Sequence, residues 1–104
     1  MSYLLRFLPT AEKSFVALQR KDRVKHAKVV TCLRKLADDP KYPGLNSHKY
    51  ASKTGPNGEE VWESYVENNA PAAWRVFWTY GPDETDPQGL LVKIVTIIAI
   101  TPHP

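Results

Sequence analysis

Arg75 is the residue whose placement most clearly suggests chemistry, because it lies inside an aromatic, strand-like segment, residues 73–80. Side chains alternate along a strand, so this segment has two faces. One face carries Trp74, Val76, Trp78 and Tyr80, and the other carries Arg75, Phe77 and Thr79. We expect the tryptophan face to pack on the core and Arg75 to project from the opposite face, where its free guanidinium suits a phosphate or a carboxylate. The alternative interpretation is an amphipathic strand with a solvated arginine.

The first part of the chain predicts a strand and a helical hairpin. A short strand over residues 3–8 is followed by a helix that opens at Pro9-Thr10, with Thr10 as its N-cap. Asp22 then caps a second helix. This helix ends at residues 38–40, because proline disfavours helix in the residue before it.

The second part of the chain changes from a helical to an alternating period. Strands are expected around residues 48–52, 61–67, 73–80 and 90–100, with turns at 54–58 and 68–71 and a polar hairpin loop at 81–89. The nearly continuous β-branched run 90–100 is typical of a central strand covered on much of both faces. Short links favour antiparallel neighbours. The order predicts an α+β, two-layer fold with an N-terminal strand, a helical hairpin and an antiparallel four-stranded meander.

Composition limits the size and the class of the protein. The 104 residues suffice for a single domain, residues 1–104, with a core of its own. The formal net charge of +3 alone is weak support for nucleic acid binding. The basic residues gather in the helical part, at Lys13, Arg20, Lys21, Arg23, Lys25, Lys28, Arg34 and Lys35. Cys32 is the only cysteine, which excludes an intrachain disulfide and a cysteine metal cluster, and no cofactor or metal is expected. The longest apolar run is far below membrane-spanning length, so we expect a soluble cytoplasmic protein.

The order of elements and several short motifs resemble the RelE/ParE superfamily, the toxins of bacterial type II toxin–antitoxin systems. The matching landmarks are Lys13-Ser14-Phe15 with Leu18, residues 33–40, Pro43-Gly44-Leu45 with His48-Lys49, Trp62-Glu63, and Trp74-Arg75-Val76-Phe77-Trp78. The last motif is the strongest match, because an aromatic-Arg-apolar-apolar-aromatic strand follows a polar turn in the same serial position. The resemblance spans essentially the whole chain and implies a RelE/ParE-like fold.

For RelE-like members the resemblance implies a ribosome-dependent endoribonuclease (mRNA interferase) that inhibits growth by cleaving mRNA in the decoding site. A ribose 2′-OH attacks the adjacent phosphate, which requires a proton acceptor, a proton donor and cations. By position, Arg75 matches the strand arginine that stabilises the phosphate, and His103 lies where relatives keep acid–base residues. Lys49 and Lys53, with the adjoining His48, match the region of basic residues that contacts RNA.

Each of these assignments has a structural alternative. His103 lies between two prolines, so it either supplies an imidazole that titrates near neutrality or belongs to a frayed tail. Lys49 and Lys53 also fit ordinary solvated lysines, and His48 fits a capping or packing residue.

The sequence departs from the family pattern in two places. Only residues 101–104 follow the last strand, where active relatives show several Arg, Lys, Tyr or His residues. Glu63 lies in a strand that often carries arginine in relatives, and it either acts as a base or weakens RNA binding. Two alternatives therefore stay open, a ParE-like DNA gyrase inhibitor and a catalytically inactive relative that only binds its antitoxin. The resemblance implies a cognate antitoxin protein as partner, with the ribosome and mRNA as the target of a RelE-like member and no membrane contact.

Overall fold

The computed structural model describes residues 2–68 and 70–103. Asn69 of the predicted 68–71 turn, Pro104 of the predicted tail and Met1 therefore lie outside the described residues. In chain order the elements are β1 (Leu4–Phe7), α1 (Pro9–Lys21), α2 (Arg23–Asp38), the short 3₁₀ helix η1 (Pro43–Leu45), β2 (His48–Thr54), β3 (Glu60–Tyr65), β4 (Trp74–Tyr80), β5 (Glu84–Thr85), β6 (Leu91–Val92) and β7 (Ile94–Pro102).

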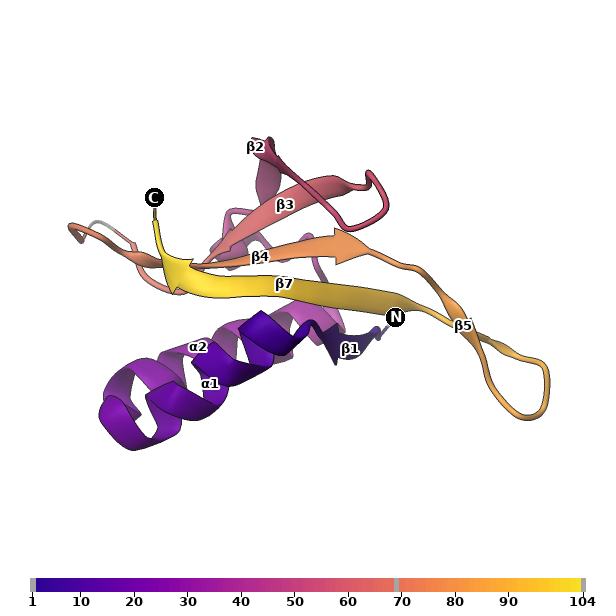
Figure 1. The fold of residues 1–104 in the computed structure, drawn as a ribbon, viewed down its shortest axis with the longest axis horizontal. Coiled ribbons are helices and arrows are strands. Elements are labelled where there is room, and N and C mark those ends of the chain that lie inside the picture. The colour runs from indigo at the N-terminus through magenta and orange to yellow at the C-terminus, as the bar shows by residue number, and fades with distance from the viewer. Residues whose placement is uncertain (1, 69, 104) are drawn as a thin grey trace.

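The main sheet has five strands in the order β1-β7-β4-β3-β2. Strands β2, β3, β4 and β7 form the predicted antiparallel meander, and β1 adds to β7 in parallel. Helices α1 and α2 both lie against one face of this sheet (Figure 1). The predicted α+β fold with a strand, two helices and an antiparallel meander is confirmed.

The core forms between the helices and one face of the sheet. Its buried members include Leu18, Val29, Leu33, Leu36, Val76, Trp78, Val95, Ile97 and Ile100. Trp78 is fully buried, and its indole Nε1–H donates to Ser64 Oγ at 2.8 Å. Trp74 packs against the same cluster and is half-buried. The prediction that the tryptophan face of the 73–80 strand packs on the core is therefore confirmed.

One of the two predicted helix caps is wrong. Helix α1 begins at Pro9, and Leu8 stands at its N-cap without a side-chain hydrogen bond. The hydroxyl of Thr10 instead donates to the backbone oxygen of Ile98 at 3.3 Å. Proline at the first helical position needs no N–H partner and has its φ already set for the helix, so a capping side chain is less needed. The cap at Asp22 is confirmed, because its carboxylate accepts the backbone N–H of Lys25 at 3.0 Å.

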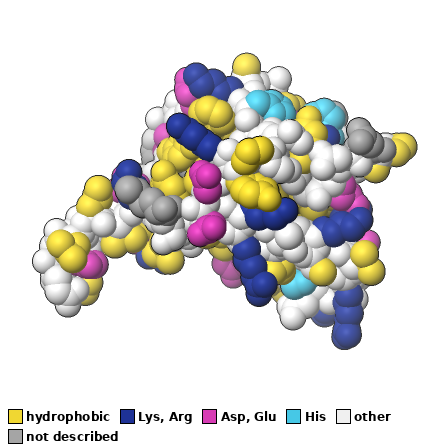
Figure 2. Space-filling view, turned by 180° about the vertical axis from the view of Figure 1, so that it is seen from behind, with side chains coloured by type: hydrophobic (Ala, Val, Ile, Leu, Met, Phe, Trp, Pro, Cys, Tyr) yellow, Lys and Arg dark blue, Asp and Glu magenta, His cyan; other side chains and the backbone are white. Residues whose placement is uncertain are grey.

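The region predicted as a polar loop (81–89) and a continuous strand (90–100) is arranged differently. Strands β5 and β6 pair as a separate two-stranded hairpin, and β7 begins only at Ile94. This hairpin projects from the body of the molecule as an arm (Figures 1 and 2). Leu90 and Leu91 are 67% and 65% exposed, so the start of the apolar run is not covered. The strand is interrupted where the carboxylate of Asp83 accepts the N–H of Ile94 at 2.9 Å, in place of a ladder bond.

Within residues 2–68 and 70–103, neither helix has the length and hydrophobicity needed to cross a bilayer.

Candidate functional site

Glu63 is the centre of a cluster of ionisable side chains on the sheet face that the helices do not cover. It lies on β3, in register with His48 on β2 and Phe77 on β4. Its side chain points away from the helices, because its neighbours Trp62 and Ser64 contact Trp78 in the core. Glu63 is 1% exposed, and a buried carboxylate is tolerated only when it is paired and hydrogen-bonded.

Two histidines that lie far apart in the sequence, His48 and His103, provide this pairing. Nε2 of His48 lies 2.7 Å from Oε1 of Glu63, and Nδ1 of His103 lies 2.9 Å from Oε2. Both imidazoles are 46% exposed, so each joins the buried carboxylate to the protein surface. His103 is held in place because its backbone N–H donates to the carbonyl of Ala73 at 2.8 Å, which extends the pairing of β7 with the start of β4. The structure therefore supports an ordered His103 rather than a frayed tail.

The hydrogen-bond partners define which ring nitrogens carry hydrogen. Nδ1 of His48 lies 2.8 Å from the carbonyl oxygen of Asn46, which can only accept, so Nδ1 must donate. When the ring is protonated, Nε2 of His48 donates to the Glu63 carboxylate as well. The same carboxylate accepts the Nδ1–H of His103, and in a neutral ring this leaves Nε2 as a free acceptor. A carboxylate that fixes a histidine tautomer in this way prepares the second nitrogen to take a proton.

Arg75 lies in the same cluster but is not free, which corrects the expectation from the sequence. The residue is 8% exposed, and Nη1 donates to the backbone oxygens of Glu67 at 2.8 Å and Trp74 at 3.1 Å. Its guanidinium carbon lies 3.7 Å from the centre of the Tyr65 ring, and Nε lies 3.9 Å from the Glu63 carboxylate. Nε is buried and has no hydrogen-bond partner among the described residues. The arginine therefore supplies positive charge beside Glu63 and is covered by Tyr65.

The two lysines predicted to bind RNA lie outside this cluster. Lys49 pairs with Trp62 in the β2–β3 register, so it projects to the opposite face from His48, where its ammonium lies 3.4 Å from Glu60. Lys53 lies over the ring of Phe77, 5.3 Å from its centre. The structure thus brings together Arg75, His48 and His103 of the predicted residues. Lys53 lies on the same sheet face, over Phe77 beside Glu63, whereas Lys49 lies on the opposite face.

The central role of Glu63 was not predicted, although the sequence carried a signal for it. Glu63 is an acidic residue inside a predicted strand, between Trp62 and Ser64, where most side chains are expected to pack against neighbours. Such a charge needs partners, and His48 and His103 were the available titratable groups at neighbouring strand ends. Tyr65, two residues further along β3, covers Arg75.

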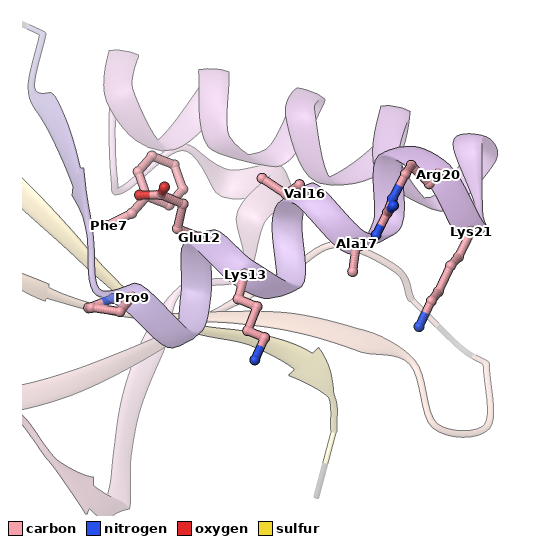
Figure 3. A pocket seen from close by; sticks show the side chains of 8 residues that line it. All are labelled: Phe7, Pro9, Glu12, Lys13, Val16, Ala17, Arg20 and Lys21. Carbon is pink, nitrogen blue, oxygen red and sulfur yellow. The ribbon is translucent and has the colours of Figure 1, made fainter.

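The other candidate features of the surface lie elsewhere. A shallow groove of about 610 Å³ runs along α1 and contains none of the clustered residues. Figure 3 shows its lining side chains, among them Lys13, Val16 and Arg20, arranged along this helix. Among the described residues, no group of three or more His, Cys, Asp or Glu side chains is arranged to hold a metal ion.

Comparison with known proteins relates the fold to one group of structures. No protein-family model matches the chain, and no curated protein matches it in sequence. Among solved structures, the chain is similar to a YoeB/ParE toxin from Agrobacterium tumefaciens, with a TM-score of 0.68 and 11% identity over 96% of this chain and 98% of that one. It is also similar to YoeB from Staphylococcus aureus, described as a dimer, with a TM-score of 0.65 and 13% identity over 100% of both chains. The chain therefore has the RelE/ParE-type fold of the YoeB/ParE toxins.

Proposed function

We propose that this protein is the toxin of a type II toxin–antitoxin system and acts as a ribosome-dependent endoribonuclease on mRNA. The cluster of His48, Glu63 and His103 carries the proposal, because it places a proton acceptor, Nε2 of His103, on a half-exposed ring that a buried carboxylate orients on the sheet face that the helices do not cover. The shared fold with YoeB/ParE toxins supports the toxin assignment. A cognate antitoxin that covers this face would keep the toxin inactive.

In the proposed reaction the ribose 2′-OH of the RNA attacks the adjacent phosphate. Nε2 of His103 takes the proton from the 2′-OH, while Glu63 holds the ring in the tautomer that can accept it. The P–O bond to the next nucleotide breaks, and the departing 5′-oxygen takes its proton from water, because both ring nitrogens of His48 are engaged, with Asn46 and Glu63. Proton transfer by positioned groups of this kind typically contributes a rate factor of about 10²–10⁴.

Arg75 takes a different role in this proposal from that of a direct phosphate clamp. Its guanidinium is buried against Tyr65 and two backbone carbonyls, so it offers positive charge from beneath the site. That charge offsets the Glu63 carboxylate and favours the negative charge that develops on the phosphate. The phosphate itself is contacted by the exposed imidazoles.

Expression of the protein without an antitoxin tests the proposal. We expect growth arrest with cleavage of transcripts inside translating ribosomes, detected by primer extension on ribosome-bound mRNA. His103→Ala and Glu63→Gln should remove the cleavage, whereas the arm variant Glu84→Gln should retain it. Double-strand DNA breaks with intact transcripts would instead identify DNA gyrase as the target, and normal growth at equal expression would refute toxicity.

A further inference from the structure

A second cleft lies on the opposite face of the sheet from Glu63, at the end formed by β3, β4 and the link that contains η1. Its volume is about 240 Å³, and its lining includes Pro40, Tyr42 and Pro43 from the link and Trp62 and Tyr80 from the sheet. Trp62 directly precedes Glu63 on β3 and faces the core side, so this cleft is distinct from the candidate site. Cavities for drug-sized ligands measure about 300–1,000 Å³, so this cleft has room for a single ring system.

The aromatic rings of this cleft are exposed but fixed in orientation. Tyr42 and Tyr80 are 43% and 36% exposed. The Tyr80 ring meets Trp62 edge-on, with centres 5.8 Å apart, and Trp62 in turn stacks on buried Trp78. The Tyr42 ring lies over Gly44, where an added Cβ would come within 2.8 Å of its Cε2 atom. Exposed rings that are held rigidly form a stacking surface that loses little entropy when a ligand binds.

Positive charges surround these rings. The ammonium of Lys35 lies 5.1 Å from the centre of the Tyr42 ring, that of Lys49 lies 5.9 Å from the centre of the Trp62 ring, and Lys41 lines the cleft. The nearby Asp39 carboxylate accepts the backbone N–H of Lys41 within its own turn. Burial, with Tyr3 and Asp39 nearby, raises the pKa of Tyr80, so its ring stays neutral. The cleft thus combines neutral aromatic rings with a basic rim.

A planar base fits this combination better than a cation does. An ammonium above an exposed ring is held weakly, whereas stacking of a nucleobase on an aromatic side chain is worth more. A base that enters the cleft would displace the lysines from the rings, and the freed ammonium groups would then reach the phosphates on either side of that base.

We propose that this cleft binds one unpaired base of a single-stranded RNA, with Lys35, Lys41 and Lys49 on the neighbouring phosphates. The proposal rests on the proposed function, because it gives the same RNA a second contact across the β2 edge of the sheet. His48 and Lys49 are consecutive on β2 and face the two sides, so a strand that passes over this edge meets both sites.

The test uses an RNA that the protein cannot cleave. A fluorescein-labelled adenosine heptanucleotide with 2′-O-methyl groups lacks the attacking hydroxyl, and an abasic oligonucleotide of the same length keeps the phosphates but not the bases. Anisotropy titrations at one fixed salt concentration should show that the intact oligonucleotide binds roughly 5- to 100-fold more tightly than the abasic one. Tyr42→Leu should remove most of this difference, and Tyr42→Phe should keep it.

Two further variants separate stacking from loss of structure. Gly44→Ala should weaken binding of the intact oligonucleotide alone, because the methyl group displaces the Tyr42 ring. Leu91→Ala, which changes an exposed apolar residue on the distant arm, should bind like the wild type. Equal affinities for the intact and abasic oligonucleotides, or a Tyr42→Leu variant that folds and binds unchanged, would overturn the proposal.

The binding test and the cleavage test can fail independently. If the wild type binds through Tyr42 but does not cleave ribosome-bound mRNA, the proposed catalysis fails and the cleft stands. If it cleaves mRNA but does not distinguish the two oligonucleotides, the cleft proposal fails alone.

Discussion

Glu67 ties helix α2 to the turn between β3 and β4, and we predict that this tie makes the protein acid-sensitive. Its carboxylate lies 2.9 Å from the ammonium of Lys25 and 3.3 Å from that of Lys28, and it accepts the backbone N–H of Trp74 at 3.1 Å. The hydrogen bond from Lys25 is the main cause that lowers the pKa of Glu67 from 4.5 to about 2, against the opposing effect of burial. The backbone carbonyl of the same residue holds Arg75.

The direction of the pH effect follows from this lowered pKa. The folded protein binds fewer protons at Glu67 than the unfolded chain does, so the stabilisation is complete above about pH 4.5 and is lost as the pH falls toward 2. The lowering of the pKa corresponds at face value to ~3 kcal/mol. Water reaches the ammonium groups, since Lys28 is 50% exposed, and screening reduces the expected contribution to about 1–2 kcal/mol.

Urea unfolding of the wild type and Glu67→Gln, followed by tryptophan fluorescence at several pH values, measures this contribution. At pH 7 the variant should unfold with a free energy about 1–2 kcal/mol lower than that of the wild type. The difference should shrink steadily between about pH 4.5 and pH 2, because the wild-type carboxylate becomes protonated. Glu84→Gln is the matched control. Glu84 on the arm forms an exposed ion pair with Arg6 on β1, so this substitution should change the free energy of unfolding little. A Glu67→Gln deficit that stays constant over this pH range would refute the reasoning, because the effect would then not come from the charge.

Three further predictions concern other buried polar groups. Glu63→Gln should lower RNA cleavage by roughly 10²–10⁴-fold in a reconstituted translation assay, because an amide no longer fixes His103 as a proton acceptor, and a smaller loss would contradict its role in the site. Ser64→Ala should lower the free energy of unfolding by about 1–3 kcal/mol, because the buried indole N–H of Trp78 loses its partner, while the exposed Ser52→Ala should have little effect in the same denaturation assay. Burial raises the pKa of the Cys32 thiol to about 12, so iodoacetamide at pH 8 should modify the protein only in denaturant. Mass spectrometry measures the modification, and rapid labelling of the native protein would show that helix α2 opens.

The sequence predicted the elements and their order because the chain changes its hydrophobic period at a clear point. Helical spacing holds up to residue 38, alternation begins at His48, and both changes appear at these positions in the structure. The arm was missed because the run from Leu90 to Ile100 is apolar both on and off the main sheet, interrupted only by Lys93 and Thr96. The hydrogen bond from the Ile94 N–H to the Asp83 carboxylate in the loop divides this run into two strands. The hydrophobic pattern of the sequence does not indicate such a contact.

The candidate site was predicted in part, because alternation assigns a side chain to a face but not to an environment. Arg75 does lie on the face opposite the helices, yet that face is closed around it by Tyr65. Phe77 on the same face is fully buried beneath Tyr50. Long aromatic side chains on β2 and β3 thus cover a surface that the pattern of β4 alone leaves open. Exposure depends on these neighbouring strands, and their register is not readable from one segment.

The burial of Arg75 and Glu63 changes how a loss of activity at Arg75 must be interpreted. A buried carboxylate beside a buried guanidinium is stable only while both are present, because removal of either leaves an uncompensated charge. Arg75→Ala would therefore disturb Glu63, and through it His48 and His103, even if the arginine never touches a phosphate. The two half-exposed imidazole rings are the parts of this cluster that an RNA can reach. The chemistry of the site is thus best tested by substitution of His103. This substitution alters the exposed surface of the site and leaves both members of the buried Glu63–Arg75 pair in place.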